Sequence, residues 1–203
     1  MSLAGCGIND IPTKQETAKA KWGDVQADYQ RRADLVPNLV ATVQGYAQQE
    51  RTVLTAVTNA RAKATSVNID ASTLSDPAAF QRFEQAQNEL SGSLGRLLAV
   101  SENYPDLKSN ANFLALQSQL EGTENRIAVA RRDYNDAVRD YNTTLRVLPT
   151  SIWAATFYHS AKPMQTFGAA EGAQTAPQVH FDLNAPPTGA PPGSTPPASN
   201  AAP

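Results

Sequence analysis

Apolar and small side chains recur along much of the chain at alternating spacings of three and four residues. This spacing is typical of helices that bury one face against neighbouring helices. After Pro37 the positions are Leu39, Val43, Tyr46, Glu50, Val53, Val57, Ala60 and Ala64. After Pro77 they are Phe80, Phe83, Gln87, Leu90, Leu94, Leu97, Ser101 and Tyr104. After Pro105 they are Phe113, Leu116, Leu120, Thr123, Ile127, Ala130, Tyr134, Ala137 and Tyr141. No stretch alternates with the period of two that a strand shows, so we predict an all-α protein.

Prolines divide this pattern into helix-sized pieces, because proline breaks or kinks a helix interior. Successive intervals of 25, 40, 28 and 44 residues separate Pro12, Pro37, Pro77, Pro105 and Pro149. Each interval is long enough for one helix and its connection. We therefore predict an elongated antiparallel up-and-down four-helix bundle.

Pro37 allows two interpretations. The heptad phase runs unbroken from Trp22 through Tyr29 to Val43, as in a single kinked helix. One helix over 14–66 would, however, outreach its partners and leave an apolar stripe uncovered. We favour a turn at 35–37 and keep one kinked helix as the alternative.

Two helix starts carry recognisable caps. Asp76 precedes Pro77, which combines a good N-cap with the proline that the first helical position tolerates. Either Ser109 or Asn110 can cap the last long helix. That helix also contains the repeat RDYN at 132–135 and 139–142. We interpret the repeat as stacked bundle layers with buried tyrosines and solvated arginines, in preference to an anion-binding face.

The ends of the chain differ from its middle. Ten of the fourteen prolines lie at or beyond Pro149, so 169–203 is predicted to be a disordered tail rich in proline and alanine. We divide the chain into an N-terminal segment (1–12), the bundle (13–148), an apolar connector that packs on the bundle end (149–168) and the tail.

Composition excludes several classes of function. A net charge of −2 argues against a nucleic-acid partner, and no run of about 18 apolar residues forms a membrane-spanning helix. Both histidines, His159 and His180, lie outside the predicted bundle, and there is one cysteine. We therefore expect no catalytic residues, no metal site and no cofactor, which is typical of a protein that is not an enzyme.

That cysteine stands in an informative place. Leu3-Ala-Gly-Cys6 resembles a bacterial lipobox, in which the cysteine sulfur takes a diacylglycerol. The charged and apolar regions of a signal peptide do not precede it here. We interpret Cys6 as a lipidation site of a longer precursor, with an accidental match as the alternative.

Charged residues on the helix seams form a second candidate site. Arg32 and Glu50 occupy seam positions, while Glu124 and Arg131 lie close to the seam of the last helix. Buried charges must be paired, so we expect an interhelical network that fixes the helix register. The alternative is a polar layer that binds a small ligand or a cation through oxygen ligands.

Four stretches resemble the LemA family of bacterial envelope proteins. They are YQRRADLVPNLV (29–40), YPDLK (104–108), LEGTENRIAVARRDYN (120–135) and DYNTT (140–144). The resemblance covers roughly 8–150 and implies a helical bundle held at a membrane by its N-terminus. It supplies no catalytic residues.

Together these observations predict a non-enzymatic, membrane-anchored lipoprotein of the bacterial cell envelope, on the periplasmic or extracytoplasmic side. Its partner would be an unknown protein or the cell wall. The alternative function is a small-ligand or cation-binding bundle.

Overall fold

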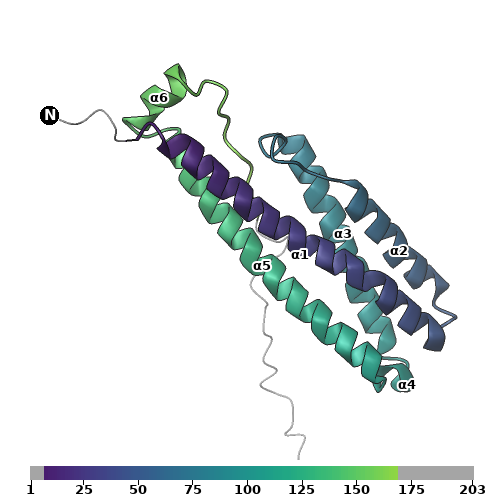
Figure 1. Cartoon of the computed structure of the whole chain (residues 1–203). Coiled ribbons are helices and arrows are strands. Elements are labelled where there is room, and N and C mark those ends of the chain that lie inside the picture. The colour runs from purple at the N-terminus through teal and green to yellow at the C-terminus, as the bar shows by residue number, and fades with distance from the viewer. Residues whose placement is uncertain (1–6, 169–203) are drawn as a thin grey trace, which may run out of the picture. The chain divides into compact units, whose positions relative to one another are not determined.

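The computed structural model describes residues 7–168, which fold into six helices (Figure 1). The long ones are α1 (Asp10–Tyr46), α2 (Arg51–Ser66), α3 (Pro77–Ser101) and α5 (Ala111–Thr144). The short ones are α4 (Pro105–Lys108) and α6 (Thr150–Thr156). No strand occurs between residues 7 and 168, so the all-α prediction is confirmed. Cys6 and the predicted tail at 169–203 lie outside the described residues.

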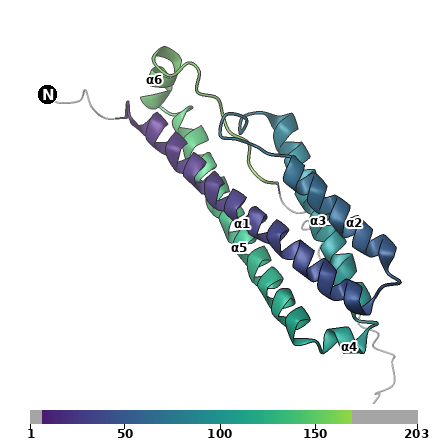
Figure 2. The same ribbon diagram turned by 45° about the vertical axis from the view of Figure 1, so that its right-hand side comes forward.

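The four long helices alternate in direction, as Figure 2 shows, which confirms the antiparallel bundle. α1 packs mainly against α5, and α2 packs mainly against α3. α1 also contacts α2, which joins the two pairs. Since α1 has 37 residues and α5 has 34, the apolar stripe of α1 is covered by a partner of nearly its own length.

The favoured turn at 35–37 is wrong, because α1 continues through Pro37 to Tyr46. Pro37 has no N–H to donate to the carbonyl of Ala33, four residues earlier. That carbonyl instead accepts a hydrogen bond of 2.8 Å from Nε of Arg61 on α2. A side chain from a neighbouring helix thus satisfies the carbonyl group that the proline leaves free. The chain turns at 47–50 instead.

The predicted helix caps are confirmed. The Asp76 side chain accepts hydrogen bonds from the backbone N–H groups of Ala78 and Ala79 at the start of α3. Asn110, one of the two residues considered, accepts from the N–H of Phe113 at the start of α5.

The buried side chains form two hydrophobic clusters, one in each half of the bundle. The first is rich in aromatic rings, with centroids 4.9–6.3 Å apart among Trp22, Phe80, Phe83, Tyr134 and Phe167. The second is mainly aliphatic and contains Val36, Leu39, Val43, Leu54, Val57, Leu90, Leu94, Leu97, Leu107, Phe113 and Leu120, with several alanines.

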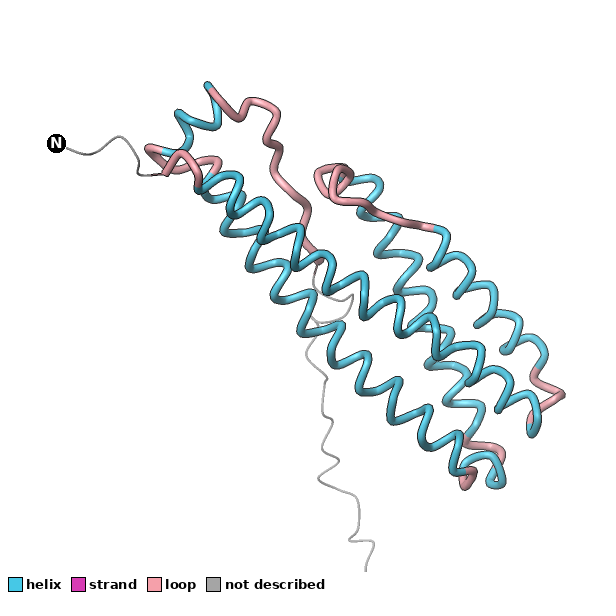
Figure 3. Tube along the Cα trace, in the orientation of Figure 1, coloured by secondary structure: helices cyan, strands magenta, loops and turns pink. Residues whose placement is uncertain are grey.

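The segment after α5 returns along the bundle. α6 lies beside the first turn of α1, and the following loop runs back toward α3 (Figure 3). Met164 and Phe167 in this loop are buried in the aromatic cluster. The connector that we expected at the bundle end therefore also supplies core side chains.

Candidate functional site

A buried arginine lies at the boundary between the two hydrophobic clusters. Arg32 of α1 is only 1% exposed. Its Nη1 donates to Oε1 of Glu124 at 3.0 Å and to the Ser91 hydroxyl at 2.6 Å. Its Nη2 donates to Oε1 of Gln87 at 2.6 Å and to the Gln87 carbonyl at 3.2 Å. We call these four residues the arginine layer.

The layer occupies the seam where each helix changes from one cluster to the other. On α1 it lies between Tyr29 and Val36, and on α3 Gln87 lies between Phe83 and Leu90. A guanidinium can be buried here because its planar set of donors meets several fixed acceptors at once. Its fork therefore ties α1 to α3 and α5 at one level of the bundle.

Of the four charged residues expected to form one network, the structure brings Arg32 and Glu124 together. Arg131 lies elsewhere: its Nη2 donates at 3.3 Å to Glu84 and at 3.3 Å to the carbonyl of Gly168. Its guanidinium also lies 4.4 Å from the centre of the Phe167 ring.

Glu50 does not reach Arg32, which corrects its expected position. Because the turn falls at 47–50, Glu50 is the N-cap residue of α2 and not a mid-helix seam residue. Its carboxylate accepts a 3.0 Å hydrogen bond from the Tyr104 hydroxyl, and this bond raises the pKa of Tyr104.

The sequence interpretation missed the parts of the layer that α3 supplies. Gln87 occupies a seam position of α3 that is otherwise held by Phe and Leu. A polar residue at such a position was the available signal for a buried polar contact. Ser91 follows four residues later, one helical turn along the same face. Neither residue carries a charge, so a search for charged residues alone overlooks both.

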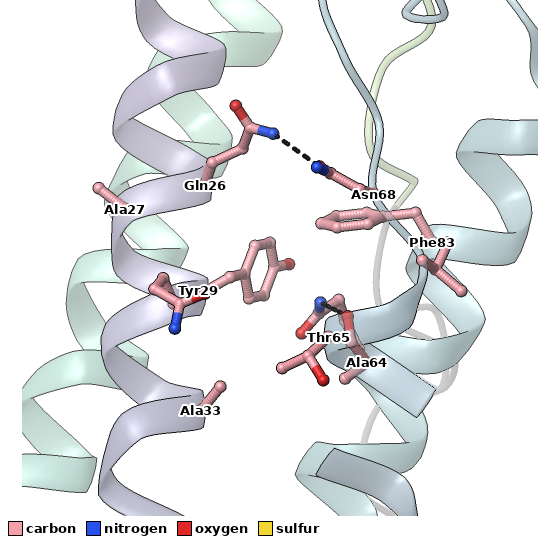
Figure 4. Close-up of a pocket in the computed structure, with 11 residues that line it drawn as sticks. Gln26, Ala27, Tyr29, Ala33, Ala64, Thr65, Asn68 and Phe83 are labelled. Carbon is pink, nitrogen blue, oxygen red and sulfur yellow. Dashed lines mark hydrogen bonds between the residues drawn. The ribbon is translucent and has the colours of Figure 1, made fainter. Parts of the chain in front are cut away.

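A pocket of about 420 Å³ adjoins the layer between α1 and the end of α2 (Figure 4). No charged side chain lines it. Its lining combines amides, hydroxyls, small apolar groups and a phenyl ring, from Gln26, Ala27, Tyr29, Gln30, Ala33, Ala64, Thr65, Val67, Asn68, Phe83 and Gln87.

The polar groups of this pocket are only partly engaged. Nε2 of Gln26 donates to Oδ1 of Asn68 at 3.3 Å and to the Ile69 carbonyl at 2.9 Å. The Tyr29 side chain extends from α1 toward Thr65 in Figure 4, and its hydroxyl has no hydrogen-bond partner among residues 7–168. Burial raises the pKa of that phenol, so it stays a neutral donor and acceptor.

The RDYN repeat of α5 has a role that the sequence did not reveal. Oδ1 of Asn142 accepts from the N–H of Met164 at 2.9 Å, and its Nδ2 donates to the Met164 carbonyl at 2.9 Å. Asn135 holds the N–H and carbonyl of Phe167 in the same way, at 2.9 and 3.1 Å. We call this pair the asparagine clamp and the segment it holds, 162–168, the strap.

The repeated tyrosines complete the clamp. Tyr141 donates its hydroxyl proton to the carbonyl of Lys162 at 3.2 Å, and Tyr134 donates to that of Gln165 at 2.9 Å. Both rings are buried, as the heptad pattern predicts. The same side chains therefore fill the core and bind the backbone of the strap.

Two further properties of residues 7–168 bear on function. No group of three or more His, Cys, Asp or Glu side chains in this range is placed to hold a metal ion. None of the helices in this range combines the length and the hydropathy that crossing a bilayer requires.

Comparison with known proteins places the sequence among described relatives. The model of the LemA family matches residues 21–181, a range that includes the arginine layer, the clamp and the strap. Magnetosome protein MamQ 2 of Paramagnetospirillum magneticum is 26% identical over 192 residues, covering 86% of this chain and 71% of that protein. Magnetosome protein MamQ of Magnetospirillum gryphiswaldense is 25% identical over 157 residues, covering 70% and 58%. Protein LemA of Metamycoplasma hominis is 23% identical over 137 residues, covering 68% and 58%.

Proposed function

Because this chain belongs to the LemA family, we propose that it is a non-enzymatic, lipid-anchored protein of the bacterial cell envelope. In this proposal Cys6 carries the lipid on the extracytoplasmic side of a membrane. The helical bundle acts as a scaffold that presents a surface to a protein or cell-wall partner.

The position of Cys6 directly before the bundle carries this proposal. Gly7 is the first described residue and α1 begins at Asp10, so a lipid on Cys6 would hold the bundle with almost no linker. Two or more acyl chains give stable anchoring, since each buried methylene contributes about 0.8 kcal/mol.

The interior of the bundle supports a scaffolding role. The arginine layer, the Arg131–Glu84 ion pair and the asparagine clamp all join separate segments of the chain. These polar groups are engaged in holding helices and strap together, which suits a rigid frame that binds partners on its outside.

Metabolic labelling with palmitate tests the anchor. We expect the full-length precursor expressed in bacteria to take up label and to fractionate with membranes, and Cys6→Ser to abolish both. Cys6 is the one cysteine among the 203 residues, so Cys6→Ser tests this thiol directly. Unlabelled wild-type protein in the cytosolic fraction would refute the proposal.

The pocket beside the arginine layer favours a second candidate function, the binding of a small uncharged ligand. The Tyr29 hydroxyl, which has no hydrogen-bond partner within 7–168, and the surrounding amides offer donors and acceptors, and the Phe83 ring offers an apolar face. The lining offers no carboxylate to a cation, so the cation-binding version of this alternative receives no support from the geometry.

Thermal shift measurements distinguish this candidate. A ligand at a hundredfold excess over its Kd stabilises the folded state by about 2.7 kcal/mol. For a domain of this size that corresponds to a rise in Tm of about 5–10 °C. We would screen uncharged sugars and capped dipeptides, with Tyr29→Phe to remove the pocket hydroxyl and Tyr46→Phe, on the same helix, as the control. No shift with any of these probes would eliminate the candidate.

A further inference from the structure

Exposed apolar side chains gather at one end of the bundle. Among residues 7–168, four of the large hydrophobic side chains that are exposed lie within 147–157: Val147 (47%), Leu148 (76%), Ile152 (52%) and Phe157 (64%). We call these four residues the end patch: Ile152 belongs to α6, and the other three flank this helix in the sequence. Figure 1 shows α6 at one end of the bundle. The remaining exposed ones, Tyr46, Leu114 and Val129, lie singly on α1 and α5. Clustered exposed apolar groups mark interaction surfaces, whereas single ones do not.

The chain segment that carries the end patch has basic side chains and no acidic ones, which favours an anionic partner. Between Asp140 and Gly168 the sequence contains no Asp or Glu, and its charged side chains at neutral pH are Arg146 and Lys162. Both are exposed. One carboxylate lies near the start of α6: Oδ2 of Asp10 would be 3.7 Å from a Cβ at Gly7. Anionic lipid headgroups attract such basic side chains.

The N-terminal segment reaches the bundle at this same end. A side chain at Gly7 would have its Cβ 3.1 Å from Cγ2 of Thr150 and 4.0 Å from Cγ of Pro149, so the backbone of Gly7 lies directly on the start of α6. Gly7, the first described residue, therefore lies beside the end patch, and Cys6 directly precedes it in the sequence.

We propose that the end patch is a membrane-contact surface that seats on an anionic phospholipid bilayer. Leu148, Ile152 and Phe157 enter the interfacial region, while Arg146 and Lys162 lie at the headgroups. α6 has seven residues and lies in the interface without spanning the bilayer. This inference rests on the proposed anchoring at Cys6, because the lipid and the end patch would meet the same membrane.

The consequence is a defined orientation. The bundle stands on the membrane by its α6 end and directs its α4 end away from it. α5 has 34 residues at about 1.5 Å each, so the far end of the bundle stands about 50 Å from the lipid surface. The α4 end of the bundle would then bind partners away from the lipid headgroups.

The single cysteine and the two tryptophans allow a direct test on the full chain. Cys6 is coupled to a maleimide phospholipid in vesicles of phosphatidylglycerol and phosphatidylethanolamine, with or without brominated acyl chains, which quench nearby indoles. Trp153 is a half-buried residue of α6 that adjoins the end patch, because its ring centroid lies 5.8 Å from that of Phe157. Trp22 is buried in the core, about 18 Å along α1 from its first residue. We expect brominated vesicles to quench Trp153 and to leave Trp22 emission.

Matched double variants identify the surface responsible. Leu148→Ser with Phe157→Ser should remove the quenching and lower the vesicle partition of the uncoupled chain at least about tenfold, or about 1.4 kcal/mol. Leu114→Ser with Val129→Ser changes exposed apolar groups away from the patch and should leave both measurements unchanged.

Three results would overturn the proposal. The first is equal tryptophan emission from plain and brominated vesicles. The second is an equal loss of quenching and of vesicle partition in both double variants. The third is a dimer in solution that the patch variant abolishes, while no lipid quenching occurs. Because Cys6 is coupled to the phospholipid chemically, the quenching result does not depend on whether cells acylate this cysteine. Palmitate labelling and tryptophan quenching can therefore fail independently.

Discussion

Removing the amide of Gln87 should leave the buried guanidinium of Arg32 short of acceptors. Gln87→Met keeps a side chain of similar length that can neither accept from Nη2 of Arg32 nor donate to the carbonyl of Ala64, bonds of 2.6 and 3.2 Å. Water cannot readily replace the lost amide, because Gln87 is 6% exposed and Arg32 is 1% exposed. The substitution therefore strips partners from a charge in the protein interior.

The expected loss follows from the two bonds removed. A hydrogen bond to a charged group contributes about 1.5–3 kcal/mol and a neutral one about 0.5–1.5 kcal/mol. We expect Gln87→Met to lower the free energy of unfolding by about 3 kcal/mol and the Tm by about 6–12 °C. In an Arg32→Met background the charge is already gone, so the same change should cost only about 1 kcal/mol. The coupling energy between the two positions is then about 2 kcal/mol.

Urea unfolding of the four proteins, followed by helical circular dichroism, measures this cycle. Glu124→Gln is a useful comparison, because Glu124 is 41% exposed and water can reach the site that it leaves. We expect it to cost less than Gln87→Met. If Gln87→Met costs the same in both backgrounds to within about 0.5 kcal/mol, Arg32 does not depend on Gln87 and the reasoning fails.

Two further predictions concern the strap and the tyrosines. Asn142→Ala should release the backbone of Met164, so that the Met164 amide exchanges about ten- to a hundredfold faster in hydrogen exchange (1.4 kcal/mol per tenfold). The control Asn112→Ala, at an exposed position on the same helix, should leave this exchange rate unchanged. Burial raises the pKa of Tyr134 and of Tyr29 above the ordinary value near 10. The unfolded chain releases these protons first, so the free energy of unfolding should be unaffected below about pH 10 and fall above it. A Tm constant from pH 9 to 11 would contradict this, and titration of phenolate absorbance gives the pKa values directly.

The elements predicted correctly are those whose determinants are local. The seam pattern, the caps at Asp76 and Asn110 and the separation of α3 from α5 all follow from residues within one or two helical turns. The predicted turn at 35–37 was wrong, and the carbonyl that Pro37 leaves free accepts a hydrogen bond from Arg61, 28 residues further along the chain. The sequence near Pro37 does not indicate that a distant residue will supply this donor.

The candidate site was predictable to the same limited extent. A charged residue at a seam position signals a partner, and Arg32 has one in Glu124. Which carboxylate pairs with it depends on the helix register across the bundle, and a displacement of the first turn moved Glu50 out of reach. The pocket depends on how α1 and the end of α2 are spaced, which no single stretch of sequence specifies.

The clamp shows why a repeat can be visible while its purpose is not. Seven helical residues rise about 10.5 Å and return to the same face within about 20°. Three residues of extended chain advance about 10 Å. Asparagines seven apart on α5 can therefore meet backbone groups three apart, as Asn142 and Asn135 do at Met164 and Phe167. A spacing of six or eight would turn the second asparagine by about 120° or 80° from the strap. The seven-residue spacing that packs the tyrosines in the core is therefore also the spacing needed to bind the backbone of an extended segment. The sequence of α5 alone does not distinguish these two roles, because the strap that reveals the second one has no periodic pattern of its own.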